Sequence, residues 1–273
     1  MSIPNTSAEA PKTSFIQSGG YIIAAIKKPA VAPAHITNRI HFRKLFIIKI
    51  IHQKRRHVML NATIETLYMS FSSLIISWFI ALPLGSLVSE TRPGGLFPSK
   101  VYNFILNRII DVGRSIPFIL LVVFLFPFTR ALIGTAIGTT AMIVPLTICA
   151  IPFEARLVEE TLSEIPYSVI EAAKIDGASN LKIIVRIKWA CKVPYLVNSI
   201  GISLINIIGY SAMAGVVGGG GLGNYAIVYG FQRFNWNIIA QAVVIIVIIV
   251  CSIQIINNLL VRLLLWRCLC IKH

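Results

Sequence analysis

Histidine and cysteine, the side chains that most often act as catalytic bases, nucleophiles and metal ligands, are few in this chain and poorly placed for catalysis. Four of the five histidines lie in the first 57 residues, and the fifth is the terminal His273. Cys268 and Cys270 stand near His273, but no pair of cysteines has the spacing of a structural zinc site. We therefore predict no catalytic residue, no metal, no cofactor and no disulfide framework on this chain.

The glycine-rich string Gly218–Gly223 is the nearest approach to a nucleotide-binding motif. A phosphate-binding loop needs a lysine followed by serine or threonine after its last glycine. Here Asn224 follows Gly223, so we predict that ATP is not bound by this chain. The string is expected to be either flexible backbone at an outer mouth, where a binding protein would dock, or a plain glycine turn.

A polar segment near residue 170 has the pattern of a coupling element. Pro166 can start a helix, because the first helical turn has no use for its missing N–H. The pattern then predicts a helix through Glu171, Ala172 and Ala173, a left-handed turn at Gly177, and a second helix from residue 181. Small alanines allow another protein to approach the backbone, and Glu171 offers a charge to a basic partner.

The composition indicates that lipid surrounds most of the chain. Of the 273 residues, 56% are hydrophobic and only 13% are charged, whereas soluble domains are about 25% charged. A membrane-spanning helix needs about 20 apolar residues, and the continuous apolar runs do not alternate as barrel strands would. We predict an all-α integral membrane protein with five transmembrane helices and a cytoplasmic coupling-helix loop, with spans near 64–88, 110–130, 136–158, 194–216 and 238–262.

Basic residues are distributed as the positive-inside rule requires, which argues against nucleic-acid binding as the reason for the net charge of +15. If the segment 154–192 is cytoplasmic, the predicted cytoplasmic parts hold thirteen Lys and Arg and the opposite loops hold two. Residues 1–58 break the pattern with ten basic residues. We expect a basic N-terminal extension, absent from a mature chain that starts near Met59 or lying on the membrane surface, and a transmembrane permease domain over 59–273.

The polar segment resembles the permeases of bacterial ABC importers, whose signature is Glu-Ala-Ala, three residues, Gly, nine residues and Ile-x-Leu-Pro. Glu171–Ala173, Gly177 and Ile187 keep this spacing, while Trp189 and Ala190 replace Leu-Pro, which leaves the local kink open. Further strings are similar to the methionine-importer subfamily: 114–118, 127–130, 143–147, 209–213 and 218–223.

The resemblance implies a homodimer of permeases in the bacterial cytoplasmic (inner) membrane. It also implies two cytoplasmic ATPase subunits that bind ATP and Mg, and an extracytoplasmic binding protein that delivers methionine. Glu171, Ala172, Ala173, Gly177 and Ile187 would then couple the permease to the ATPase.

Small residues in the predicted fourth span indicate either close helix packing or a pore lining. We expect Met213, with Gly209, Tyr210 and Ser211, to form an outer gate, because methionine is a flexible apolar side chain. Three alternatives remain open: a permease for another small amino acid or polar solute, an ion-coupled secondary transporter, and a membrane subunit without transport activity.

Overall fold

The structure is a computed structural model that describes the backbone of residues 34–270 and the side chains of residues 56–266. Residues 51–273 form a compact unit that is separate from residues 1–50. All regular structure over the described backbone is helical, as the sequence predicts. Most of the predicted N-terminal extension, residues 1–58, lies outside the described side chains. Its absence from a mature chain, or its position on the membrane surface, stays a prediction.

Among the described residues, four helices are long and apolar enough to cross a membrane: Arg56–Thr91, Thr139–Ser163, Asn180–Val217 and Trp236–Trp266. They belong to α1 (Ala34–Thr91), to α5 (Thr139–Ser163), to the run from α7 through α8 (Ala190–Ala214) and η2, and to α10 (Trp236–Cys270). These helices contain most of the predicted spans 64–88, 136–158, 194–216 and 238–262. The count of five spans remains a prediction.

The predicted span 110–130 is not one continuous helix, which corrects the expectation from the sequence. Three helices occupy this stretch: α2 (Lys100–Ser115), α3 (Phe118–Phe124) and α4 (Phe126–Ile133). Pro117 causes the first break, since a residue before proline is pushed out of the helical region and Ile116 is extended. Pro127 lies in the first turn of α4, where proline is tolerated.

The polar segment is also more helical than predicted. The predicted span 136–158 ends before the helix does, because α5 continues to Ser163. After α6 (Tyr167–Ile175), the chain passes through α7 (Asn180–Lys182) and the π-helix η1 (Ile183–Trp189) directly into α8. Only residues 164–166 and 176–179 therefore connect α6 to the two long helices.

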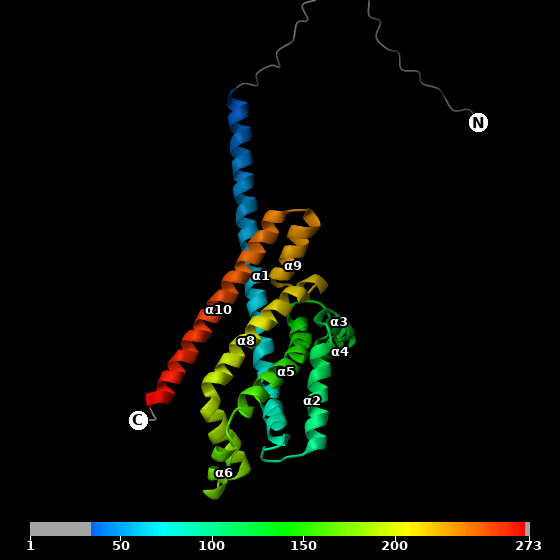
Figure 1. The fold of residues 1–273 in the computed structure, drawn as a ribbon. Helices are drawn as coiled ribbons and strands as arrows, with labels where there is room; N and C mark the ends of the chain where they lie inside the picture. Colours follow the sequence, from blue (N-terminus) through cyan, green and yellow to red (C-terminus); the bar gives the residue numbers. More distant parts are fainter. Residues whose placement is uncertain (1–33, 271–273) are drawn as a thin grey trace, which may run out of the picture. The chain divides into compact units, whose positions relative to one another are not determined.

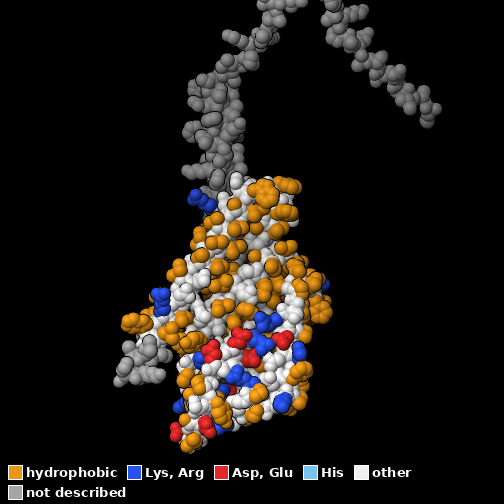
Figure 2. Space-filling model, viewed as in Figure 1, with side chains coloured by type: hydrophobic (Ala, Val, Ile, Leu, Met, Phe, Trp, Pro, Cys, Tyr) orange, Lys and Arg blue, Asp and Glu red, His pale blue; other side chains and the backbone are white. Residues whose placement is uncertain are grey.

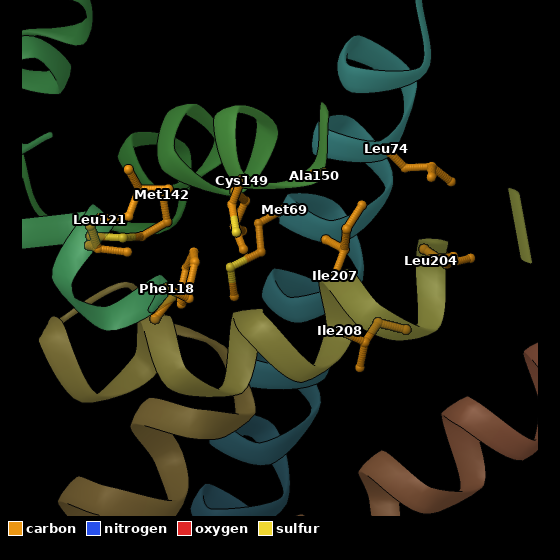
Figure 3. Packing of buried hydrophobic residues seen from close by; sticks show 13 residues of the cluster. Met69, Leu74, Phe118, Leu121, Met142, Cys149, Ala150, Leu204, Ile207 and Ile208 are labelled. Carbon is orange, nitrogen blue, oxygen red and sulfur yellow. The ribbon is translucent and has the colours of Figure 1, made fainter. Parts of the chain in front are cut away.

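The hydrophobic core lies where α8 packs against α5, with α1 and α3 beside them (Figure 1). Figure 3 shows Met69 of α1 and Met142 and Cys149 of α5 close together in this core, with Ile207 of α8 beside them. The helix α8 also packs against α10. Because four helices contribute to one cluster, the core holds together segments that are far apart in the sequence.

Two glycines allow the helices to cross closely. A Cβ built on Gly85 of α1 would lie 2.4 Å from the carbonyl oxygen of Ala155 in α5. On Gly201 of α8 it would lie 2.2 Å from the side chain of Asn257 in α10. Packing through small residues is typical of membrane helices.

The two ends of the 51–273 unit differ in chemistry. The short α6 lies at one end, and α9 (Gly221–Tyr225) lies at the other (Figure 1). On the face that Figure 2 shows, acidic and basic side chains gather toward the α6 end, and hydrophobic ones cover the rest. The remaining short helices are η2 (Gly215–Val217), η3 (Ala226–Gly230) and η4 (Phe231–Arg233).

Candidate coupling site and translocation path

The helix α6 has the local structure that its sequence predicts. It begins directly after Pro166 and ends at Ile175, and the N–H of the following Asp176 donates to the Ala172 carbonyl at 3.0 Å. Gly177 has a φ of +74°, the left-handed conformation that glycine adopts without steric cost. Ser179 precedes α7, although its side chain makes no capping hydrogen bond.

The predicted coupling residues are divided between two faces of this element. Glu171 and Ala172 are exposed, so this edge of α6 is open to a partner. Ala173 instead packs inward with Ile170, in a cluster completed by Leu96 and Ile183. Ile187 is half-buried against the same cluster. Ala173 is therefore buried within this chain, and its part in coupling to the ATPase stays a prediction.

A buried ion pair that the sequence did not reveal joins α1 to η1. Lys188 Nζ lies 2.5 Å from Glu90 Oε1, and both side chains are at most 3% exposed. The second oxygen, Glu90 Oε2, accepts the Leu96 N–H at 3.1 Å. From the sequence, Glu90 marked only the end of an apolar run. A buried charge requires a partner. A search for a basic residue that could reach Glu90 from another helix is the step that could have found this ion pair.

Trp189, which replaces the leucine of the family signature, makes its own contact to α1. Its indole Nε1–H donates to Ser86 Oγ at 3.0 Å. The chain has a π-helix at Ile183–Trp189 rather than a proline kink at this point. Such π-helical turns are rare and occur often at functional sites.

The predicted gate residues do not all face the same way. Met213 is 50% exposed, and a Cβ added at Gly209, one turn before it, would meet nothing within 4 Å. Tyr210 stacks on Phe118 with ring centroids 5.1 Å apart. Ser211 is buried and donates to the Ile208 carbonyl at 2.7 Å. Only Gly209 and Met213 thus share an open face of α8.

The glycine-rich string forms a turn that packs against α1 and α8. Glu65 Oε2 of α1 accepts the Gly221 N–H at 2.7 Å, and Thr66 Oγ1 accepts the Leu222 N–H at 2.8 Å. A Cβ on Gly223 would lie 2.1 Å from the Ala212 carbonyl oxygen. The glycines are therefore needed for close packing against α1 and α8, which agrees with the glycine turn that was one of the two interpretations of the sequence. Docking of a binding protein at this turn stays a prediction.

Two further polar contacts cross between the helices. Glu154 is fully buried in α5, and its Oε1 accepts a hydrogen bond from Ser77 of α1 at 2.9 Å. Nearer the α6 end, Arg156 lies 2.6 Å from both Asp111 and Glu159. Among the described side chains, no group of three or more histidine, cysteine or acidic residues could hold a metal ion.

Comparison with known proteins gives consistent matches. The family model described as "Binding-protein-dependent transport system inner membrane component" matches residues 60–266. A probable D-methionine transport system permease protein MetI from Vibrio cholerae is 44% identical over 75% of this chain and 91% of its own length. The methionine import system permease protein MetP from Bacillus subtilis is 42% identical over 73% of this chain and 90% of its own.

Solved structures agree with these matches. A chain from an inward-facing structure of the MetNI methionine ABC transporter has a TM-score of 0.74 and 41% identity, and the match covers 76% of this chain and 96% of that one. A chain from an amino acid ABC transporter crystallised with histidines has a TM-score of 0.64 at 16% identity, which shows a common fold.

Proposed function

Because the chain belongs to the family of binding-protein-dependent transport system inner membrane components, we propose that it is the pore-forming permease subunit of an ATP-driven importer in a bacterial cytoplasmic membrane. The observation that carries the proposal is α6, a short helix between two long apolar helices with Glu171 and Ala172 on its open edge. A partner subunit can reach this helix, and short connections join it to two membrane spans. A movement of the partner can therefore be transmitted through α6 to both spans.

ATP would be bound and hydrolysed by two separate cytoplasmic subunits, with Mg, while this chain supplies the path. A ligand shifts a conformational equilibrium only by its difference in affinity for the two states. ATP must therefore bind the partner subunits better in one state of the complex. In this proposal α6 moves with those subunits and switches the helices between inward and outward openings.

The solute that we propose is methionine. Support comes from relatives 42–49% identical to this chain that are named as methionine permeases. A second copy of the chain would complete the path, with Gly209 and Met213 facing it, and an extracytoplasmic binding protein would deliver the solute. A permease for another small amino acid is the alternative within the same family.

Reversing the charge at Glu171 tests the role of α6. We expect Glu171→Arg to weaken copurification of the ATPase by more than about tenfold and to abolish uptake, since unpairing a charge in an interface costs about 2–5 kcal/mol. Glu160→Arg is the matched control, because Glu160 is exposed at the end of α5 rather than on α6. Normal ATPase copurification and uptake in Glu171→Arg would contradict the proposal.

A further inference from the structure

The turn between α1 and α2 contacts the buried side of α6. Leu96, at the centre of this turn, is only 7% exposed. It packs in one cluster with Ile170 and Ala173 of α6 and with Ile183 of η1. The contact lies on the side of α6 opposite Glu171 and Ala172, which are exposed. The chain connectivity ties α6 only to α5 and α8, so this packing adds α1 as a third neighbour.

Glu90 fixes the shape of this turn. Its carboxylate accepts the Leu96 N–H at 3.1 Å, and its main-chain carbonyl accepts the Phe97 N–H at 3.0 Å. A Cβ on Gly95 would lie 2.2 Å from the same carbonyl oxygen, so the turn is folded tightly on the Glu90 backbone. Since adjacent N–H groups bond to one residue, Leu96 is held at a set position relative to the end of α1.

Lys188 closes the arrangement from the other side. It pairs with Glu90 at 2.5 Å from within η1, the π-helix that follows α6 and α7. Trp189, the next residue, donates to Ser86 of α1. Two consecutive residues of η1 therefore bond to α1, one through a buried ion pair and one through a neutral hydrogen bond.

We propose that Glu90, Lys188 and Leu96 are positioning residues that make α6 and the α6 end of α1 move as one body during the transport cycle. The inference rests on the proposed coupling function of α6 and adds the element through which its movement reaches α1. A close-packed cluster transmits displacement because it has little free space to absorb it. A buried ion pair does the same, because separating its charges leaves both unpaired in a site without water.

Leu96→Ala tests the packed contact, with Leu96→Met as the conservative variant that keeps the volume. Glu90→Gln combined with Lys188→Met tests the ion pair without leaving a single buried charge. Glu164→Gln is the control, because it breaks a different ion pair, between the exposed Glu164 after α5 and Lys192 in the first turn of α8. The readout is labelled methionine carried per ATP hydrolysed in vesicles containing the complete transporter and binding protein. This ratio does not depend on how much complex is recovered.

We expect Leu96→Ala and the double variant to lower the ratio by about tenfold, a usual size for coupling between two sites. The ATPase should still copurify with both, because Glu171 and Ala172 are unchanged. Leu96→Met and Glu164→Gln should keep the ratio of the parent. A parental ratio in both Leu96→Ala and the double variant, even with reduced protein yield, would overturn the inference and assign these residues to folding alone. Failure of the proposed function would give a different result: the Glu171→Arg variant would still copurify with the ATPase and would still take up methionine.

Discussion

At the scale of single residues, each buried acid near or within the long helices has a hydrogen-bond or ionic partner. Glu90 has Lys188 and the Leu96 N–H, and Glu154 has the hydroxyl of Ser77. An unpaired charge in hydrocarbon is costly. Glu90 is paired with the Lys188 ammonium, whereas Glu154 accepts a hydrogen bond on Oε1 alone and its buried Oε2 has no partner among the described residues. In the sequence both acids stand at the ends of charge-free runs. The pairs could not be predicted, because the side chains that bond to them, Lys188 and Ser77, come from segments 77 or more residues away.

Met213 carries the prediction at this scale. If the exposed Met213 side chain closes the outer end of the path, the Met213→Ala variant should let methionine leak through the permease. We expect faster methionine passage and higher ATP hydrolysis without the binding protein, measured in reconstituted vesicles. Ile202→Ala is the control, because Ile202 is also exposed on α8 but lies about 16 Å farther from the outer end at 1.5 Å per residue. Parental flux and hydrolysis in Met213→Ala would remove the gate and leave the permease assignment intact.

At the scale of elements, the sequence predicts helices best where local signals mark their ends. Pro166 and Gly177 bound α6 as expected, since a proline and a left-handed glycine act on their own backbone. The stretch 110–130 was predicted as one span because a run without charged residues does not register the breaks at Pro117 and Leu125. The contact of Leu96 with α6 was not predictable, because it depends on packing between segments about 75 residues apart.

Close crossing of α8 and α10 gives a prediction for this scale. A methyl group at Gly201 would collide with Asn257, whose amide donates to Asn198 at 3.1 Å. We expect Gly201→Ala to destabilise the protein by about 1–3 kcal/mol, the usual cost of overpacking, seen as a lower thermal midpoint in detergent. Gly209→Ala on the same helix has open space within this chain and should keep the parental midpoint. Equal midpoints for Gly201→Ala and the parent would contradict the packing argument.

At the scale of the whole molecule, one copy of the chain leaves much apolar surface uncovered. The most apolar stretch of α10 is only 11% buried within the chain. The face of α8 at Gly209 and Met213 is also open: a Cβ on Gly209 would meet nothing within 4 Å, and Met213 is 50% exposed. Lipid accounts for the first surface. In the proposed assembly a second copy of the chain covers the second surface, and the charged α6 end is left for the ATPase.

The solute provides the last prediction. Glu154 is the one acid that is fully buried in the middle of the described apolar helices, and it is bonded to Ser77 rather than open to a solute. The described part of α8 around Met213 presents small and apolar side chains, which suit a neutral amino acid and offer no counter-charge to a cationic one. We therefore expect vesicles with the complete transporter to accumulate labelled methionine in an ATP-dependent way and to exclude labelled lysine. Because a binding protein supplies selectivity, weak binding in the path is sufficient, and tight binding there would slow release. Uptake of lysine without uptake of methionine would replace the solute and retain the family, whereas methionine uptake driven by an ion gradient without ATP would favour a secondary transporter.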